Sequence, residues 1–73
     1  MSPAEPIALQ SATLDSALYD APRLILQLEF CSGAIYQYFQ VPASIYQDLL
    51  AAESKGQYFN RWIRNQFLCS RSR

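Results

Sequence analysis

The sequence contains no histidine, and its only thiols are Cys31 and Cys69. A structural zinc ion takes four nitrogen, sulfur or oxygen ligands, so two cysteines without histidine are too few for a tetrahedral site. The six carboxylates are scattered and show no spacing typical of a paired acid and base, and neither cysteine has a visible base partner. We therefore expect a non-catalytic protein with no metal, no cofactor and no small-molecule substrate.

The chain also lacks any segment that resembles a secretory signal or a membrane span. Its first residues have neither the basic region nor the apolar run of a signal peptide. One disulfide between Cys31 and Cys69 is arithmetically available, but two reduced thiols are the plainer interpretation. The sequence thus predicts a cytoplasmic protein that does not associate with membranes.

The length of 73 residues supports a single domain. Hydrophobic residues make up 51% of the chain and charged residues 16%, which argues against intrinsic disorder. A chain this short buries only roughly 60% of its unfolded surface, so an additional source of stability is expected. With metal and disulfide set aside, oligomerisation remains, and we expect a homodimer.

The formal net charge is zero, but the charges are unevenly distributed. Residues 1–50 contain one cation and five acids, whereas residues 51–73 contain five cations and one acid. Such a split indicates an anionic partner for the basic end, or two subunits that pair basic against acidic parts. Overall neutrality weighs against strong, non-specific DNA binding, which needs many neutralised phosphates.

Alternation of apolar and polar residues predicts three β-strands, over residues 12–19, 24–31 and 34–40. The middle segment is the clearest, with a continuous apolar face at every second position, formed by Leu24, Leu26, Leu28 and Phe30. In the first segment the same period places Leu14, Ser16 and Leu18 together. A proline turn at residues 20–23 and Ser32-Gly33 separate the strands, which predicts an antiparallel meander.

The period changes at Pro42, which fits the first turn of a helix but not the interior of a sheet. Ile45, Leu49 and Ala52 form one helical row that must pack on the sheet. Residues 53–56 interrupt this helix, and Ser54 is placed to cap a second one, which carries an apolar face as far as Phe67. The sequence therefore predicts an α+β fold of order β-β-β-α-α, with a loose arm at residues 1–10 and a frayed basic tail at residues 69–73.

Several motifs in this order resemble the KTSC domain family. They are Ile35-Tyr36-Gln37-Tyr38-Phe39, Val41-Pro42 and Ser54-Lys55-Gly56-Gln57-Tyr58-Phe59-Asn60, and the resemblance covers residues 11–68. The family is named for an extension at the C-terminus of some lysyl-tRNA synthetases and also occurs as small stand-alone proteins, largely bacterial. The resemblance implies binding of RNA or another nucleic acid and no agreed catalytic residues. Any link to aminoacylation is by analogy alone.

Tyr36 and Tyr38 are the first candidate site residues. They lie two positions apart and so project from one face of the predicted third strand. Paired aromatic rings on a sheet are typical of RNA-binding platforms, where stacking contributes about 1–3 kcal/mol per base. The alternatives are that the rings belong to the core beneath the helices or fill an interface between subunits.

The cations of the basic end are the second group of candidates: Lys55, Arg61, Arg64, Arg71 and Arg73. Arg61 and Arg64 are three residues apart and neighbour each other on a helix. Together the five side chains are placed to bind phosphates with modest, salt-sensitive affinity. The alternative is a solvated helix face whose positive end favours the helix dipole.

These observations favour a non-catalytic nucleic-acid-binding module, with RNA ahead of DNA. In this hypothesis the two tyrosines stack on bases and the five cations hold phosphates. The alternative hypothesis is a protein-interaction or homodimerisation module in which the same tyrosines form the contact patch.

Overall fold

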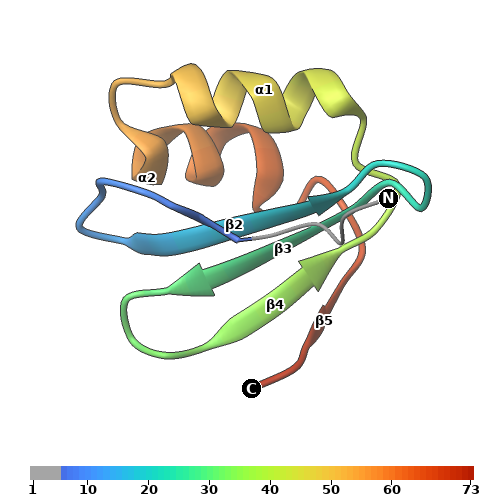
Figure 1. The fold of residues 1–73 in the computed structure, drawn as a ribbon, viewed down its shortest axis with the longest axis horizontal. Helices are drawn as coiled ribbons and strands as arrows, with labels where there is room; N and C mark the ends of the chain where they lie inside the picture. The colour runs from blue at the N-terminus through green and yellow to red at the C-terminus, as the bar shows by residue number, and fades with distance from the viewer. Residues whose placement is uncertain (1–5) are drawn as a thin grey trace.

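The protein forms one five-stranded antiparallel sheet with helices on one side, as the computed structural model of residues 6–73 shows (Figure 1). The sheet order follows the chain order. The strands are β1 (Ile7–Ala8), β2 (Leu14–Asp20), β3 (Ile25–Phe30), β4 (Ile35–Tyr38) and β5 (Cys69–Arg71). The three strands expected from the alternation pattern are present as β2, β3 and β4. Each is shorter than expected, and β2 extends one residue further, to Asp20.

The helices lie between β4 and β5 in the chain. Helix α1 (Ala43–Ala51) follows Pro42, and α2 (Lys55–Tyr58) continues directly into the π-helical turn η1 (Phe59–Ile63). The predicted cap is confirmed, since the hydroxyl of Ser54 accepts a hydrogen bond of 3.3 Å from the backbone N–H of Gln57. The α+β class is therefore confirmed, while the order is four strands, two helices and a fifth strand.

Two short edge strands extend the three-stranded sheet that the sequence predicted. Strand β1 pairs with β2 within the segment interpreted as an arm, and β5 pairs with β4 within the segment interpreted as a tail. Residues 1–5 lie outside the described part of the chain. Both strands are two or three residues long and all their residues are exposed, so no alternating apolar pattern marks them. Backbone pairing with a neighbour forms them instead.

A β-bulge in β2 changes which of its side chains face the helices. The register shifts between Leu14 and Ser16, so an extra residue occupies one side of the ladder. As a result Leu14 and Ala17 are both fully buried, while Leu18 is only half-buried. The expectation that Leu14, Ser16 and Leu18 share one face was wrong, because a strict period of two does not continue through a bulge.

Backbone breaks also shorten two of the predicted elements. Gln40 adopts φ 58°, a left-handed conformation that ends β4 before it. Arg64 is extended and Asn65 has φ 63°, so the second helix ends at Ile63 rather than continuing to Phe67. Leu24, also left-handed at φ 56°, is 41% exposed instead of buried on the apolar face of β3.

The core fills the space between the sheet and the helical layer. The sheet contributes Leu14, Ala17, Leu26 and Leu28, and the helices contribute Leu49 and Ile63, all with no exposed surface. At its margin the rings of Tyr19 and Tyr46 stack at 4.8 Å, and the Tyr19 hydroxyl donates a 2.6 Å hydrogen bond to the Val41 carbonyl.

Each of the two glycines permits a local feature that a side chain would hinder. Gly33 has φ 95°, which permits the tight turn between β3 and β4. A Cβ on Gly56 would lie 2.9 Å from the Thr13 hydroxyl oxygen, so this position allows α2 to approach the loop before β2 closely.

Neither helix within residues 6–73 has the length and apolar character needed to span a membrane. Cys31 and Cys69 are both exposed, unpaired thiols.

Candidate nucleic-acid interface

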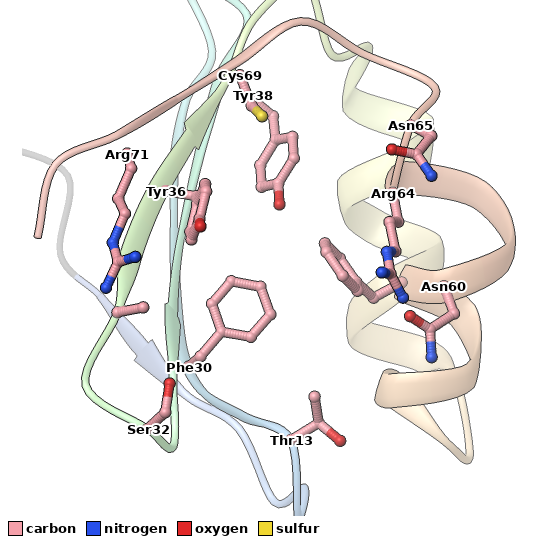
Figure 2. Close-up of a pocket in the computed structure, with 12 residues that line it drawn as sticks. Thr13, Phe30, Ser32, Tyr36, Tyr38, Asn60, Arg64, Asn65, Cys69 and Arg71 are labelled. Atoms are coloured by element: carbon pink, nitrogen blue, oxygen red, sulfur yellow. The ribbon is translucent and has the colours of Figure 1, made fainter.

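An open cleft separates β4 and β5 from the η1 turn (Figure 2). Its volume is about 560 Å³, within the range of small-molecule sites. Aromatic rings form its floor, and polar side chains form most of its rim, namely Thr13, Ser32, Asn60, Arg64, Asn65 and Arg71, with the Cys69 thiol beside them. The cleft lies on the helix side of the sheet, where the helical layer does not cover the last two strands.

Four aromatic rings form a continuous ring cluster, defined as Phe30, Tyr36, Tyr38 and Phe59. The Phe59 ring meets those of Phe30 and Tyr38 edge-on, at centroid distances of 5.2 and 5.8 Å. Phe30 meets Tyr36 in the same manner at 5.8 Å. Edge-to-face pairs of this kind are favourable beyond simple burial. The ring cluster therefore ties β3 and β4 to η1 and fixes the width of the cleft.

The two tyrosines differ in how much ring they present. The sheet register pairs Tyr38 with Leu26 and Tyr36 with Leu28, so both rings share the helix-facing side with core residues. Tyr38 is only 5% exposed, whereas Tyr36 is half-buried. Their rings lie 6.3 Å apart and nearly parallel. Tyr38 thus belongs largely to the core, and Tyr36 stands at the edge of the cleft.

The Tyr38 hydroxyl keeps its proton at neutral pH and points into the cleft (Figure 2). Burial raises the pKa of this phenol to about 12, with Cys69 and Tyr36 acting in the same direction and Arg64 in the opposite one. The hydroxyl forms no hydrogen bond with another side chain or backbone group of residues 6–73. Every buried side-chain oxygen in that range has a partner, so this oxygen is not buried. It is therefore a solvent-accessible donor at the floor of the cleft.

The η1 turn gathers the polar side chains of one wall. Its π-helical closure, with the Arg64 N–H bonded to the Phe59 carbonyl at 2.8 Å, widens the turn by one residue. Asn60, Arg64 and Asn65 all line the cleft as a result. Turns of this kind occur often at functional sites. The left-handed backbone of Asn65 adds a second irregularity at the same wall.

Strand β5 supplies the opposite wall. It pairs Arg71 with Tyr36 and Cys69 with Tyr38, which places both side chains on the cleft side of the sheet. The guanidinium carbon of Arg71 lies 5.8 Å from the centroid of the Tyr36 ring. The Arg71 guanidinium therefore lies over one face of the Tyr36 ring. The two groups together form one layer at the edge of the cleft.

The cleft carries positive charge that no carboxylate balances. None of its lining residues is acidic. Among residues 6–73, the two ion pairs join Arg23 to Asp20 and Arg73 to Glu29, both at 3.7 Å, and neither involves Arg64 or Arg71. Arg71 only donates a 3.2 Å hydrogen bond to the carbonyl of Arg73. The site therefore favours an anion.

The other predicted cations do not line the cleft. Lys55 donates a 2.9 Å hydrogen bond from Nζ to the Ala52 carbonyl at the end of α1. Arg61 lies over the ring of Trp62, 5.5 Å from its centroid. Arg73 pairs with Glu29. The structure thus brings Tyr36, Tyr38, Arg64 and Arg71 together out of the seven predicted site residues and leaves three elsewhere.

Sequence reasoning missed the asparagines and the two phenylalanines of the site. Asn60 and Arg64 are four residues apart, a spacing that places side chains on one helical face and that offered a signal. Asn65 carries no comparable signal, because it reaches the cleft only through the π-helical closure and a left-handed backbone. Phe30 and Phe59 look like ordinary core residues in the sequence.

The fold and this cleft define a small α+β module with an open, aromatic and basic site. Comparison with family models matches residues 10–67 to the KTSC domain, so the chain belongs to the KTSC domain family. The crystal structure of a KTSC domain protein from Yersinia pestis superposes with a TM-score of 0.90 at 31% identity. That match covers 93% of this chain and 96% of the other.

Two kinds of relatives are similar in sequence to this chain. An uncharacterized protein of Stutzerimonas stutzeri is 47% identical over 60 residues, which are 82% of this chain and 84% of that protein. A lysine–tRNA ligase of Nostoc punctiforme is 47% identical over 49 residues, which are 67% of this chain but 9% of the ligase. The chain is homologous to such small proteins and to the C-terminal region of cyanobacterial lysyl-tRNA ligases.

Proposed function

We propose that this protein is a non-catalytic nucleic-acid-binding module that takes single-stranded RNA at the cleft. The observation that carries the proposal is a ring-lined cleft holding two arginines that no carboxylate balances. Arginine forks bind phosphate oxygens, and guanidinium planes and aromatic rings both stack on bases. Arg64 and Arg71 hold phosphates, and the layer of Tyr36 and Arg71 stacks on an adjacent base.

The preference for RNA over DNA rests on the relatives. Lysine–tRNA ligases, by their name, use an RNA, and this chain is 47% identical to one of them over 49 residues. The shared part is a small fraction of the ligase, so the activity of the ligase itself is not proposed for this protein. Titration with RNA and DNA of identical sequence distinguishes the two ligands, and we expect RNA to bind more tightly.

Fluorescence anisotropy with a short, unstructured RNA tests the proposal through its salt dependence. Neutralising two phosphate charges predicts that log affinity falls with log salt at a slope of about −1.4, whereas neutralising five predicts about −3.5. A slope near −1.4 supports contacts limited to Arg64 and Arg71. An affinity that does not change with salt, or no binding up to millimolar RNA, removes the proposal.

A second proposal is homodimerisation, which the free edge of β5 supports. The Phe39 N–H donates to the Leu68 carbonyl and the Ser72 N–H donates to the Ile35 carbonyl, so these groups face β4. By the alternation of antiparallel pairing, the peptide groups of Cys69 and Arg71 point away from β4. Unpaired strand edges of this kind readily pair with another chain.

Leu68, which is 82% exposed beside this edge, adds apolar area to the proposed contact. Such an interface uses β5 and Leu68 rather than the tyrosine patch, because Tyr38 is buried within its own subunit. Sedimentation at micromolar concentration should give twice the monomer mass, and Leu68→Glu should restore the monomer. A monomer throughout the concentration range would remove this proposal.

A further inference from the structure

The two walls of the cleft each present one guanidinium, and this arrangement favours a ligand with more than one negative charge. Arg71 extends from β5 and Arg64 follows η1 on the other side (Figure 2). Neither pairs with a carboxylate within residues 6–73. Because aromatic rings line the floor, water screens these charges less than at a flat surface. The site is therefore complementary to a ligand that carries about two negative charges.

Hydrogen-bond donors surround the same space. The protonated Tyr38 hydroxyl lies at the floor, and the amides of Asn60 and Asn65 lie on the rim. With the two guanidinium groups, these donors come from both walls and from the floor. A phosphate group carries several acceptor oxygens on one atom and so can accept from several of these donors at once.

The floor of the cleft is closed. Tyr38 and Phe59 are 5% and 6% exposed and pack edge-on at 5.8 Å, so their rings join the floor to the core. A ligand therefore approaches from the open side and meets this floor. A phosphodiester within a strand has chain on both sides and carries one charge, whereas a phosphomonoester has chain on one side and carries about 1.5 to 2 charges at neutral pH.

We infer that the cleft binds a terminal phosphomonoester of a single RNA strand in preference to an internal phosphodiester. This inference rests on the proposed RNA-binding function and specifies its ligand. Arg64 and Arg71 share the phosphate oxygens from opposite walls, the Tyr38 hydroxyl donates from below, and the first base lies on the layer of Tyr36 and Arg71. Both ends of a strand can carry such a group, so the test includes both.

Anisotropy titrations with one unstructured RNA of fixed sequence and an internal label test the inference. The three forms compared carry a 5′-phosphate, a 3′-phosphate or hydroxyls at both ends. We expect about tenfold tighter binding of at least one phosphorylated form than of the hydroxyl form, in line with the strength of charge-assisted hydrogen bonds. The preference should increase as pH rises through about 6, where the monoester loses its second proton.

Variants then locate the preference. Arg64→Ala and Arg71→Ala should each reduce it to less than threefold, whereas Arg23→Ala, an exposed cation at the turn after β2, should retain it. Equal binding of all three forms, with affinity still dependent on Arg64, overturns the terminal-phosphate inference and leaves the proposed function standing. No binding of any form overturns both. A preference that Arg64→Ala and Arg71→Ala leave intact also overturns the inference, because the phosphate then binds outside the cleft.

Discussion

The helix-facing side of the sheet has two halves. In both, every second side chain points toward the helices, but the helical layer covers only one of them fully. Over β2 and β3 the side chains Leu14, Ala17, Leu26 and Leu28 have no exposed surface. Over β4 and β5 the neighbouring positions carry Tyr36, Tyr38, Cys69 and Arg71, and a cleft remains open. The first half is buried by aliphatic packing, whereas the second half contains aromatic rings next to arginines that no carboxylate balances.

Position in the sheet, rather than the residue pattern alone, therefore decides whether an alternating face is buried or stays open. Leu49 and Ile63 of the helical layer are fully buried in the same core cluster as the side chains of the first half. The Phe59 ring packs against Tyr38 of the second half, and polar side chains from η1 and the residues after it line the cleft there. The covered half accounts for stability, and the open half accounts for the proposed binding. Substitutions in each half separate these two roles.

The largest expected effect is on the covered half. Leu28→Ala should lower the free energy of unfolding by about 3 kcal/mol, because it removes fully buried methyl groups and leaves a cavity. Urea denaturation measures this change. Asn60→Ala on the open side is the control, since this side chain is exposed at the cleft, and it should change stability by less than about 0.5 kcal/mol. Equal losses in both variants would mean that the two halves are not distinguished by packing.

Arg64→Ala should have the next largest effect, on binding and not on folding. We expect about tenfold weaker RNA binding, which corresponds to about 1.4 kcal/mol, since one guanidinium is removed from the cleft. The free energy of unfolding should change by less than about 0.5 kcal/mol, because Arg64 is exposed and has no ion pair within residues 6–73. Anisotropy measures the RNA affinity, and thermal denaturation of the same sample measures the stability. A large loss of stability would assign Arg64 to the fold.

Tyr19→Phe should lower the free energy of unfolding by about 1 kcal/mol. The Tyr19 hydroxyl donates a 2.6 Å hydrogen bond to the carbonyl of Val41, and its removal leaves that acceptor without this partner. RNA affinity should not change, because Tyr19 lies under α1 with Tyr46 and away from the cleft. Reduced RNA binding with unchanged stability would reverse the roles assigned to the two halves.

The smallest effect concerns one proton on Tyr38. Its pKa of about 12 lies above the ordinary value near 10, so burial favours the neutral phenol of the folded protein. This contribution to stability is fully present below about pH 10 and is lost as pH rises through about 12. Ultraviolet titration should therefore show a tyrosine that ionises late, and Tyr38→Phe should remove that phase. If Tyr38→Phe leaves the late phase unchanged, Tyr38 is not held at the floor of the cleft.

The sequence predicted the parts of the fold that an apolar period marks. The three central strands, the helix after Pro42 and the Ser54 cap are all present, and the KTSC resemblance is confirmed. The edge strands β1 and β5 were not predicted, because backbone pairing rather than side-chain burial forms them. The bulge in β2 was equally invisible, since a register shift leaves no mark in composition.

The candidate site was only partly predictable for the same reason. Tyr36 and Tyr38 were placed correctly on one face, but which face the helices cover follows from the pairing of Tyr38 with Leu26. Arg71 reaches Tyr36 only because β5 pairs with β4. Charge in the sequence predicted a basic end. It did not separate Arg64 and Arg71 from the cations that lie elsewhere.

A map of backbone and arginine side-chain chemical shifts during titration with single-stranded RNA locates the binding surface. We expect the largest changes at Tyr36, Asn60, Arg64 and Arg71, around the open half of the sheet. Changes concentrated instead at Tyr58, Arg61 and Trp62, where Arg61 lies over the half-exposed indole, would contradict this expectation.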